Sequence, residues 1–271
     1  MSISLRVLIV EDSENDVMLL ELELQRAGYD PLCLRVDTAK AMEQALNQHS
    51  WDLVIADYVM PRFNGLEALA LVKQHQLDIP FIIVSGHITD DTAVAAMKAG
   101  AHDYVMKDNL ARLGPAVERE LRETDLRRER RRAEQRLAAE HSITRLLASA
   151  ASLEETAPAI LDVLLESLGM DVAALWVFDP IQALLRHSAT RLRIKSFPDE
   201  SLSGLHQNLT FAQRVGLPGR AWHERRNVWL TDLSSTADPA RADSLARAGL
   251  NSAGAFPIQS GGNVLGVLEL F

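Results

Sequence analysis

Short apolar runs alternate with stretches of helical spacing along the N-terminal part of this chain. Runs such as LRVLIV and FIIVSG are apolar on both faces of a strand, which is typical of a parallel sheet that helices cover. The helical stretches end at glycines such as Gly28 and Gly100, and the last of them contains Val94 and Met97. Successive units of this kind predict a doubly wound α/β domain. The expected strands are Leu5–Val10, Pro31–Val36, Asp52–Ala56, Pro80–Val84 and His102–Met106.

Polar residues close four of these strands: Glu11 and Asp12 the first, Asp57 the third, Ser85 the fourth and Lys107 the fifth. Ligands of an open parallel sheet bind outside the carboxyl ends of its strands, so these side chains are expected to converge. Three carboxylates that pack together repel one another unless a cation lies among them, and Mg²⁺ prefers such hard oxygen ligands. One carboxylate can then attack a phosphoryl group, while Mg²⁺, Lys107 and Ser85 receive its oxygens.

The segments around these residues resemble the response regulator receiver family. The matching segments are VLIVEDSENDVMLL, DLVIADYVMPRFNGLEAL, PFIIVSGH and AGAHDYVMKDNL, and they define a receiver-like domain over residues 1–125. The resemblance implies a flavodoxin-like sheet with five parallel strands in the order 2-1-3-4-5. It also implies Mg²⁺ as the cofactor.

The resemblance assigns a role to each matching residue. Asp57 corresponds to the phosphoacceptor, and Glu11 and Asp12 to the metal-binding acidic pair. In the family a proline usually follows the lysine, whereas Asp108 follows Lys107 here. Because a non-proline cis bond costs about 3 kcal/mol, we expect a trans bond and a rearranged loop. The other counterparts are the carbonyl of Val59 as a metal ligand, Ser85 as the hydroxyl that moves toward the phosphate, Lys107 as the phosphate-contacting lysine and Tyr104 as the switch aromatic.

Arginine, glutamate and alanine dominate residues 110–149, and neither proline nor glycine occurs there after Pro115. This composition predicts one long connecting helix, with Glu118/Arg122 and Glu123/Arg127 at favourable i,i+4 spacing. A solvated helix and a dimer helix both remain open, and we favour the dimer because apolar positions occur at both ends. Two partial heptad seams in different registers carry those positions: Leu113, Val117, Leu121 and Thr124, and Ala133, Leu137, Thr144 and Leu147.

The remaining residues, 141–271, predict an α+β domain with an antiparallel sheet. A helix is expected to begin near Ser152, which forms a capping-box pattern with Glu155. The sequence Gly261-Gly262-Asn263 is a hairpin signal. The expected strands are Val172–Phe178, Leu184–Ala189, Val228–Thr231, Ala253–Ile258 and Val264–Phe271.

This second part resembles the GAF family of small-molecule-sensing and dimerising modules. The matching segments are LESLGMDVAALWVFD, GLPGRAWHERRNVWLTDL, ARAGLNSAGAFPI and NVLGVLELF. The domain contains no cysteine, which disfavours a covalently attached bilin, and the small-molecule ligand is unassigned. Because the chain stops at Phe271, inside an expected strand, we expect the domain to be truncated and the natural protein to continue.

Composition narrows the setting in which such a chain works. A net charge of −9 disfavours nucleic acid as a partner. No run reaches the roughly 18 apolar residues of a membrane helix, so we expect no membrane association. The N-terminus lacks a signal-peptide layout, and Cys33 is the only cysteine, so no intramolecular disulfide can form. Together these features predict a cytoplasmic protein.

The sequence therefore predicts a two-component phosphorelay protein. A histidine kinase or histidine phosphotransfer protein would donate a phosphoryl group to Asp57, and the long helix would relay the change to the GAF-like domain. The chain would be no enzyme beyond assisting its own phosphorylation and dephosphorylation, and it would form a homodimer through the helix and the GAF-like domain. The alternative is the regulatory N-terminal part of an enzyme, such as a hybrid histidine kinase or a diguanylate cyclase.

Overall fold

The structure is a computed structural model that describes residues 2–86, 90–150, 152–193, 209–233, 245–247 and 249–271. The chain divides into two compact units, Met1–Arg131 and Arg132–Phe271, and the boundary falls within one long helix. Each unit is described by itself. None of the described helices combines the length and the apolar character needed to cross a membrane.

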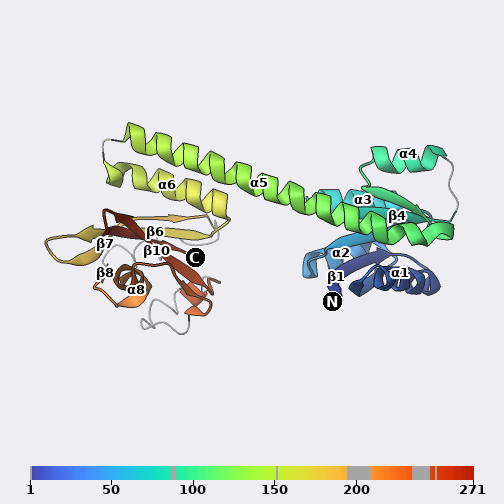
Figure 1. Ribbon diagram of the computed structural model, residues 1–271, viewed down its shortest axis with the longest axis horizontal. Coiled ribbons are helices and arrows are strands. Elements are labelled where there is room, and N and C mark those ends of the chain that lie inside the picture. Colours follow the sequence, from blue (N-terminus) through green and yellow to red (C-terminus); the bar gives the residue numbers. More distant parts are fainter. Residues whose placement is uncertain (1, 87–89, 151, 194–208, 234–244, 248) are drawn as a thin grey trace. The chain divides into compact units, whose positions relative to one another are not determined.

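The first unit is built around a five-stranded sheet in which every neighbouring pair is parallel (Figure 1). The strand order is β2-β1-β3-β4-β5, so the predicted doubly wound topology is confirmed. The strand bounds lie within two residues of the expected ones. They are β1 (Ile3–Val10), β2 (Tyr29–Val36), β3 (Leu53–Asp57), β4 (Phe81–Ser85) and β5 (Asp103–Met106).

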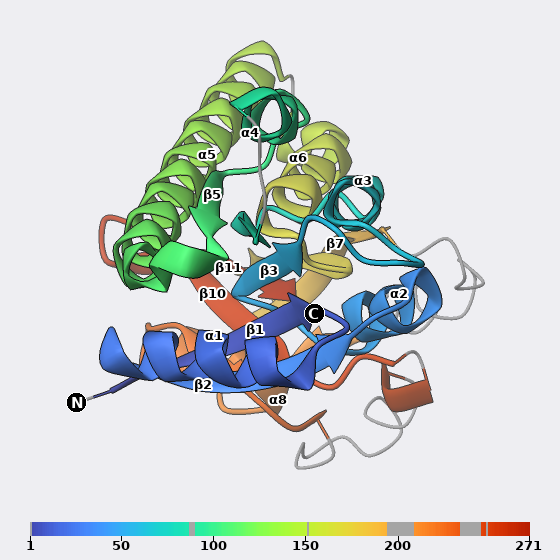
Figure 2. The ribbon, with the colours of Figure 1, turned by 90° about the vertical axis from the view of Figure 1, so that its right-hand side faces the viewer.

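Helices cover both faces of this sheet. Helices α1 (Glu14–Arg26) and α5 (Leu113–Ser149) share one buried core with it, and α1 runs alongside β2 (Figure 2). Helices α2 (Ala39–Gln48), α3 (Gly65–Gln74) and α4 (Asp90–Lys98) share the other. The apolar pattern of α4 is misleading, because Val94 and Met97 are exposed and Ala96 makes the buried contact.

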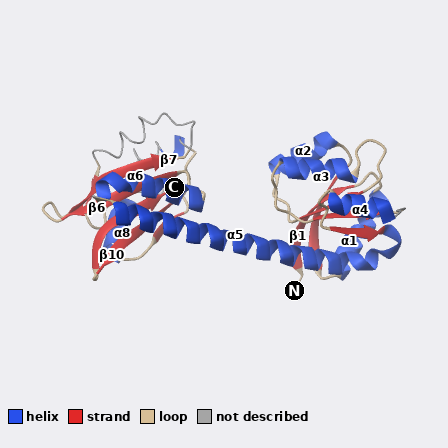
Figure 3. Ribbon diagram, turned by 90° about the horizontal axis from the view of Figure 1, so that it is seen from above, coloured by secondary structure: helices blue, strands red, loops and turns tan. Residues whose placement is uncertain are grey.

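Helix α5 is one unbroken helix of 37 residues, as predicted (Figure 3). It begins three residues later than expected, because a 3₁₀ helix, η1 (Lys107–Arg112), precedes it. No peptide bond of the described residues is cis, which agrees with the trans bond expected after Lys107. The chain after β5 is therefore a 3₁₀ helix that begins at Lys107.

The first apolar seam of α5 packs inside the first unit and not against a partner chain. Leu113 and Val117 are buried in the core shared with α1, and Thr124 is buried as well. Arg119 pairs with Asp103 of β5 at 2.6 Å, so this half of the helix is anchored to the edge of the sheet. The expectation that both seams pack against a partner is corrected here, because spacing along a helix does not tell which surface covers it.

The expected i,i+4 pairing along α5 is also replaced in part. Arg127, which was expected to pair with Glu123, lies 3.5 Å from Asp78 in the segment between α3 and β4. The second seam is different from the first, because Leu137 and Leu147 are both exposed in the part of α5 that belongs to the second unit. The predicted dimer through the helix and the GAF domain stays a prediction, and within α5 it now rests on this second seam.

The second unit is an antiparallel six-stranded sheet with helices on both faces, in the strand order β8-β7-β6-β11-β10-β9. The predicted hairpin between the last two strands is confirmed, since Gly261 and Gly262 both have positive φ, as a tight two-residue turn requires. The elements are α6 (Leu153–Leu168), β6 (Val172–Asp179), β7 (Leu184–Leu192), β8 (Thr210–Phe211), α8 (Gly216–Glu224), β9 (Val228–Leu230), β10 (Ala253–Ser260) and β11 (Asn263–Leu270).

Two details of this unit differ from the expectation. Strand β8 was not expected, because two residues are too short to show a periodic pattern. Ser152 caps α6 by accepting the N–H of Glu155 at 3.3 Å, which is the serine half of the predicted capping box. The reciprocal bond from the Glu155 carboxylate is not among the hydrogen bonds of the described residues.

Candidate functional site

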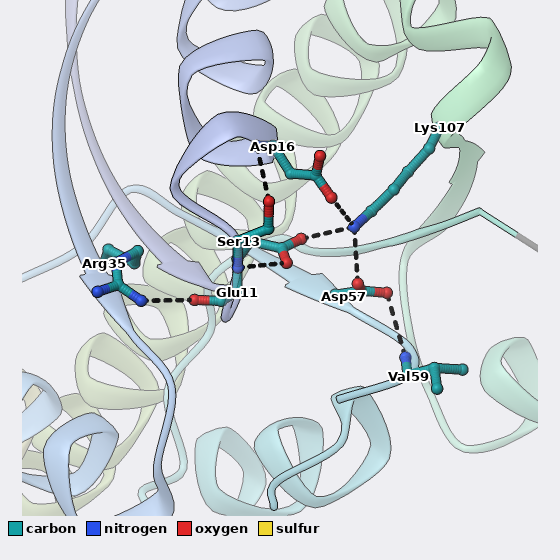
Figure 4. A network of polar contacts seen from close by, with 7 residues as sticks. All are labelled: Glu11, Ser13, Asp16, Arg35, Asp57, Val59 and Lys107. Carbon is teal, nitrogen blue, oxygen red and sulfur yellow. Dashed lines mark hydrogen bonds and ion pairs between the residues drawn. The ribbon is translucent and has the colours of Figure 1, made fainter. Parts of the chain in front are cut away.

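Strand ends place the polar residues of the candidate site at one edge of the parallel sheet (Figure 4). Glu11 follows β1, Asp57 and Ser85 are the last residues of β3 and β4, and Lys107 follows β5. Glu11 is 1% exposed, Asp57 8% and Ser85 1%, so three polar groups are withdrawn from water among apolar strands. Burial of this kind is unfavourable without partners, and it points to a site rather than to loop residues.

The acidic residues of the site form a cluster that fits a cation. Glu11, Asp12 and Asp57 each offer a carboxylate oxygen, and these oxygens lie within 4.8 Å of one another. Glu11 and Asp57 are buried, whereas Asp12 is exposed and keeps the cluster open to solvent. Oxygen donors around a site that retains access to water suit Mg²⁺, which keeps several of its waters when bound.

Lys107 provides the positive charge of the site. Its Nζ lies 2.8 Å from Glu11 Oε2, 2.7 Å from Asp57 Oδ2 and 2.5 Å from Asp16 Oδ2. Burial by itself lowers the pKa of Lys107, but the hydrogen bonds to Asp16, Asp57 and Glu11 outweigh it and raise the pKa above its ordinary value. The ammonium is therefore charged at every physiological pH, and all three of its donors are directed at carboxylates.

The backbone around the acidic cluster holds the carboxylates in place. Asp57 Oδ1 accepts the N–H of Val59 at 3.1 Å, and Glu11 Oε1 accepts the N–H of Ser13 at 3.1 Å. Burial raises the pKa of Glu11, and its contact with Lys107 offsets part of that rise. Arg35 donates to the carbonyl of Glu11 at 3.3 Å from the end of β2. The predicted role of the Val59 carbonyl as a metal ligand stays a prediction.

A glycine makes room for the backbone of the phosphoacceptor candidate. A Cβ on Gly65, the first residue of α3, would lie 2.8 Å from the carbonyl oxygen of Asp57 and 3.2 Å from Tyr58 Cα. Both neighbours are backbone atoms, which cannot move as the tip of a flexible side chain can. The close approach of α3 to the end of β3 therefore depends on this glycine.

The two predicted switch residues lie on the neighbouring strands β4 and β5. Ser85 is buried at the end of β4, next to β5. Tyr104 is half-buried in β5, where its hydroxyl donates to Met106 Sδ at 2.6 Å. Burial, reinforced by the charge of Asp108, raises the pKa of Tyr104. The movement of either residue on phosphorylation stays a prediction.

The sequence reasoning missed Asp16. This residue lies in the first turn of α1, where an acid is favourable for the helix N-terminus in any protein. The signal that could have revealed it is that this helix begins directly after the acidic residues at the end of β1, which brings its first turn to the same site.

The second unit also buries a carboxylate, but in a different setting. Glu269 is fully buried in β11 and accepts the indole N–H of Trp176 at 3.0 Å. Trp176 makes edge-to-face contacts with His187 and Phe211, at ring-centroid distances of 5.5 Å and 4.8 Å. Burial lowers the pKa of His187. The predicted small-molecule ligand of this unit stays a prediction.

The first unit thus belongs to the class of doubly wound α/β domains that gather acidic residues and a lysine at the carboxyl edge of the sheet. Comparison with protein families gives the family: residues 7–118 match the response regulator receiver domain, and residues 150–271 match the GAF domain. The chain therefore consists of a response regulator receiver domain followed by a GAF domain, a combination that belongs to two-component signalling.

Known proteins resemble each part of the chain separately. The response regulator ArlR of Staphylococcus saprophyticus is 35% identical over 102 residues, which are 38% of this chain and 45% of that protein. The chain therefore aligns with less than half the length of this relative. A signal receiver domain of a Luxo repressor protein from Vibrio parahaemolyticus is 28% identical over 46% of this chain and 95% of its own, with a TM-score of 0.42. The A. Aeolicus nlh2 GAF domain is 20% identical over 52% of this chain and 80% of its own, with a TM-score of 0.42.

Proposed function

We propose that this chain accepts a phosphoryl group on Asp57 from the phosphohistidine of a histidine kinase or a histidine phosphotransfer protein, in a reaction that depends on Mg²⁺. The observation that carries this proposal is the Lys107 ammonium, which lies 2.7 Å from Asp57 beside two further acidic residues. A carboxylate in this setting is a nucleophile with its counter-charges already assembled.

The transfer needs little covalent machinery. An oxygen of Asp57 forms the new O–P bond while the P–N bond to the donor imidazole breaks, and that nitrogen takes up a proton from solvent. Bound at Glu11, Asp12, Asp57 and the Val59 carbonyl, Mg²⁺ would supply positive charge to the phosphoryl oxygens. The chain's own contributions are the Lys107 ammonium and the Ser85 hydroxyl, which donate to those oxygens. The chain is then no enzyme beyond the formation and hydrolysis of its own acyl phosphate.

The contacts of α5 support a route from the site to the rest of the chain. Asp103 and Tyr104 are adjacent in β5, and the Asp103 carboxylate pairs with Arg119 of α5 at 2.6 Å. A rearrangement of β5 on phosphorylation would therefore change the anchoring of α5. Since α5 continues to Ser149, a change in its anchoring would be passed along the helix toward the GAF domain.

The exposed seam of α5 supports a homodimer. Leu137 and Leu147 lie in the seam that the first unit does not cover, and both are exposed. Two copies of this seam could pack together and bury these side chains, as apolar heptad positions do in coiled coils. Through such a dimer, phosphorylation would act on a pair of GAF domains.

The test uses phosphoramidate, a small donor whose P–N bond mimics that of phosphohistidine. The full chain should take up one phosphoryl group in Mg²⁺ and none in a chelator, as measured by intact-protein mass spectrometry. Hydroxylamine, which cleaves acyl phosphates, should remove the group. A label that forms without a divalent cation, or that survives hydroxylamine, would contradict the proposal.

A further inference from the structure

The third donor of the Lys107 ammonium is directed at Asp16, a residue of α1 that lies outside the acidic cluster of Glu11, Asp12 and Asp57. We propose that Asp16 is a positioning residue of the phosphorylation site, which holds Lys107 between α1 and Asp57 and releases one N–H donor when the phosphoryl group arrives. This inference rests on the proposed function, and it assigns a role to a residue that the function does not otherwise use.

The geometry of the ammonium requires such an exchange. Lys107 has three N–H donors, and Glu11, Asp57 and Asp16 accept all of them. Figure 4 shows Asp16 reaching the ammonium from α1, on the side away from Asp57. A phosphoryl oxygen on Asp57 can therefore gain a hydrogen bond from Lys107 only if one of the three carboxylates gives one up. Glu11 and Asp57 also belong to the cation cluster, so Asp16 is the acceptor that can be exchanged without changing that cluster.

Helix capping does not account for the orientation of Asp16. In α3, the carboxylate of Glu67 accepts the N–H of the capping residue Asn64 at 3.0 Å, which completes a capping box. Asp16 occupies the equivalent position in α1, after the capping residue Ser13. The N–H of Ser13, however, donates to Glu11 at 3.1 Å. The carboxylate of Asp16 is thereby directed to Lys107 rather than to its own helix end.

The surroundings of this ion pair strengthen it. Asp16 and Lys107 border a cavity of about 20 Å³ whose other lining residues are apolar: Leu19, Leu20, Val84 and Leu110. A charge pair beside apolar side chains interacts more strongly than one in bulk water. The pair therefore holds Lys107 in the pocket even when a cation competes for the oxygens of Glu11 and Asp57.

Removal of the Asp16 charge should have two effects. Lys107 would lose one acceptor, so its ammonium would be held less firmly and would be more accessible to a reagent. The lysine would also rely more on Glu11 and Asp57, the oxygens that Mg²⁺ needs. We therefore expect Asp16→Asn to make Lys107 more reactive and to weaken the binding of Mg²⁺.

The matched control is Glu14→Gln. Glu14 lies in the same first turn of α1, its side chain is 83% exposed, and it is 3.7 Å from Arg35. This control removes the same charge and the same favourable interaction with the helix N-terminus. It leaves every contact of Lys107 in place.

Two measurements on the full chain test the proposal. Reductive methylation of Lys107 in metal-free buffer, read by peptide mass spectrometry, should be at least about threefold faster in Asp16→Asn than in the parent. Calorimetric titration with Mg²⁺ should show about threefold to tenfold weaker binding. Glu14→Gln should change either quantity by less than about twofold, because exposed charges are screened.

Equal behaviour of Asp16→Asn and Glu14→Gln in both measurements would overturn the proposal. Asp16→Glu, which keeps the charge, should methylate more slowly than Asp16→Asn, and a rate equal to that of Asp16→Asn would count against the proposal. Methylation reads Lys107 without any phosphoryl transfer. A chain that takes up no phosphoryl group, while Asp16→Asn still exposes Lys107, would overturn the proposed function and support the placement of the lysine.

Discussion

The receiver and the GAF domain both bury carboxylates, but they do so at different places in their sheets. In the receiver, Glu11 and Asp57 lie at strand ends and share the Lys107 ammonium. In the GAF domain, Glu269 lies within β11 and accepts an uncharged indole N–H from Trp176. The receiver site opens to solvent through the exposed Asp12, whereas Glu269 has no exposed surface.

This difference separates a reactive site from a structural one. At a strand end, a side chain leaves the packed sheet and meets those of neighbouring strands, where a substrate can also reach it. Within a strand, the same carboxylate is enclosed and its hydrogen bonds mainly stabilise the fold. Substitutions should therefore affect chemistry in the receiver and stability in the GAF domain.

The largest expected effect concerns the GAF domain. Trp176→Phe keeps an aromatic ring but removes the N–H that Glu269 accepts, which should destabilise the domain by about 2–3 kcal/mol. The reason is that a buried carboxylate loses one of its donors. Hydrogen exchange of β6 and β11 amides, followed by mass spectrometry, should show faster opening. The control Trp229→Phe alters an exposed tryptophan and should change exchange by less than about 0.5 kcal/mol.

The corresponding change in the receiver should act on chemistry. Gly65→Ala places a Cβ 2.8 Å from the backbone oxygen of Asp57, so the end of β3 must shift. Because small displacements of a nucleophile slow a reaction strongly, phosphorylation by phosphoramidate should slow about tenfold or more. Gly86→Ala is the control, since among the described residues its Cβ would meet only the Lys107 side chain, at 3.9 Å. Equal phosphorylation rates in the two variants would contradict the claim that a Cβ at Gly65 displaces Asp57.

The exposed seam of α5 tests whether the two domains act within a dimer. Multi-angle light scattering should show a dimer of the full chain and a monomer of a receiver cut near Asp125. Leu137→Glu should weaken the dimer about tenfold, because it places charge in the apolar seam. A monomeric full chain at every accessible concentration would contradict the dimer.

The smallest effect concerns pH and the far end of β3. A hydrogen bond from Arg6 lowers the pKa of Asp52. The pair therefore stabilises the receiver at pH values above 3.8, the ordinary pKa of aspartate. That contribution is lost as the pH falls through the lowered pKa. Asp52→Asn should therefore lower the melting temperature of the receiver slightly at neutral pH, and the difference should vanish in acid. A difference that grows below pH 3.8 would have the wrong sign.

The sequence predicts much of the receiver site for a physical reason. Apolar runs mark the strands, and the residue that follows each strand of a parallel sheet lies at the carboxyl edge of that sheet. The proximity of Asp57 and Lys107 can therefore be predicted from the sequence alone. Asp16 escapes this reasoning because an acid at a helix N-terminus already has a local explanation. The buried face of α4 escapes it because Ala96 gives little apolar signal.

The contacts of the GAF domain are harder to predict from the sequence, for a related reason. Trp176 and Glu269 are 93 residues apart, and they meet through the antiparallel register of β6 and β11, which no local pattern reveals. The first seam of α5 is equally ambiguous, because its spacing predicts a covered face but not whether a sheet or a second helix covers it. Side-chain contacts can therefore be predicted from the sequence where the backbone topology alone determines which residues come together.

The most direct test compares two aspartates at opposite ends of β3. The full chain and its variants Asp57→Asn and Asp52→Asn are incubated with phosphoramidate and Mg²⁺, and the label is mapped by peptide mass spectrometry. The parent and Asp52→Asn should each carry one phosphoryl group on Asp57, and Asp57→Asn should carry none. Labelling of Asp57→Asn at the level of the parent, or a label that maps to another residue, would contradict the assignment of Asp57 as the phosphoacceptor.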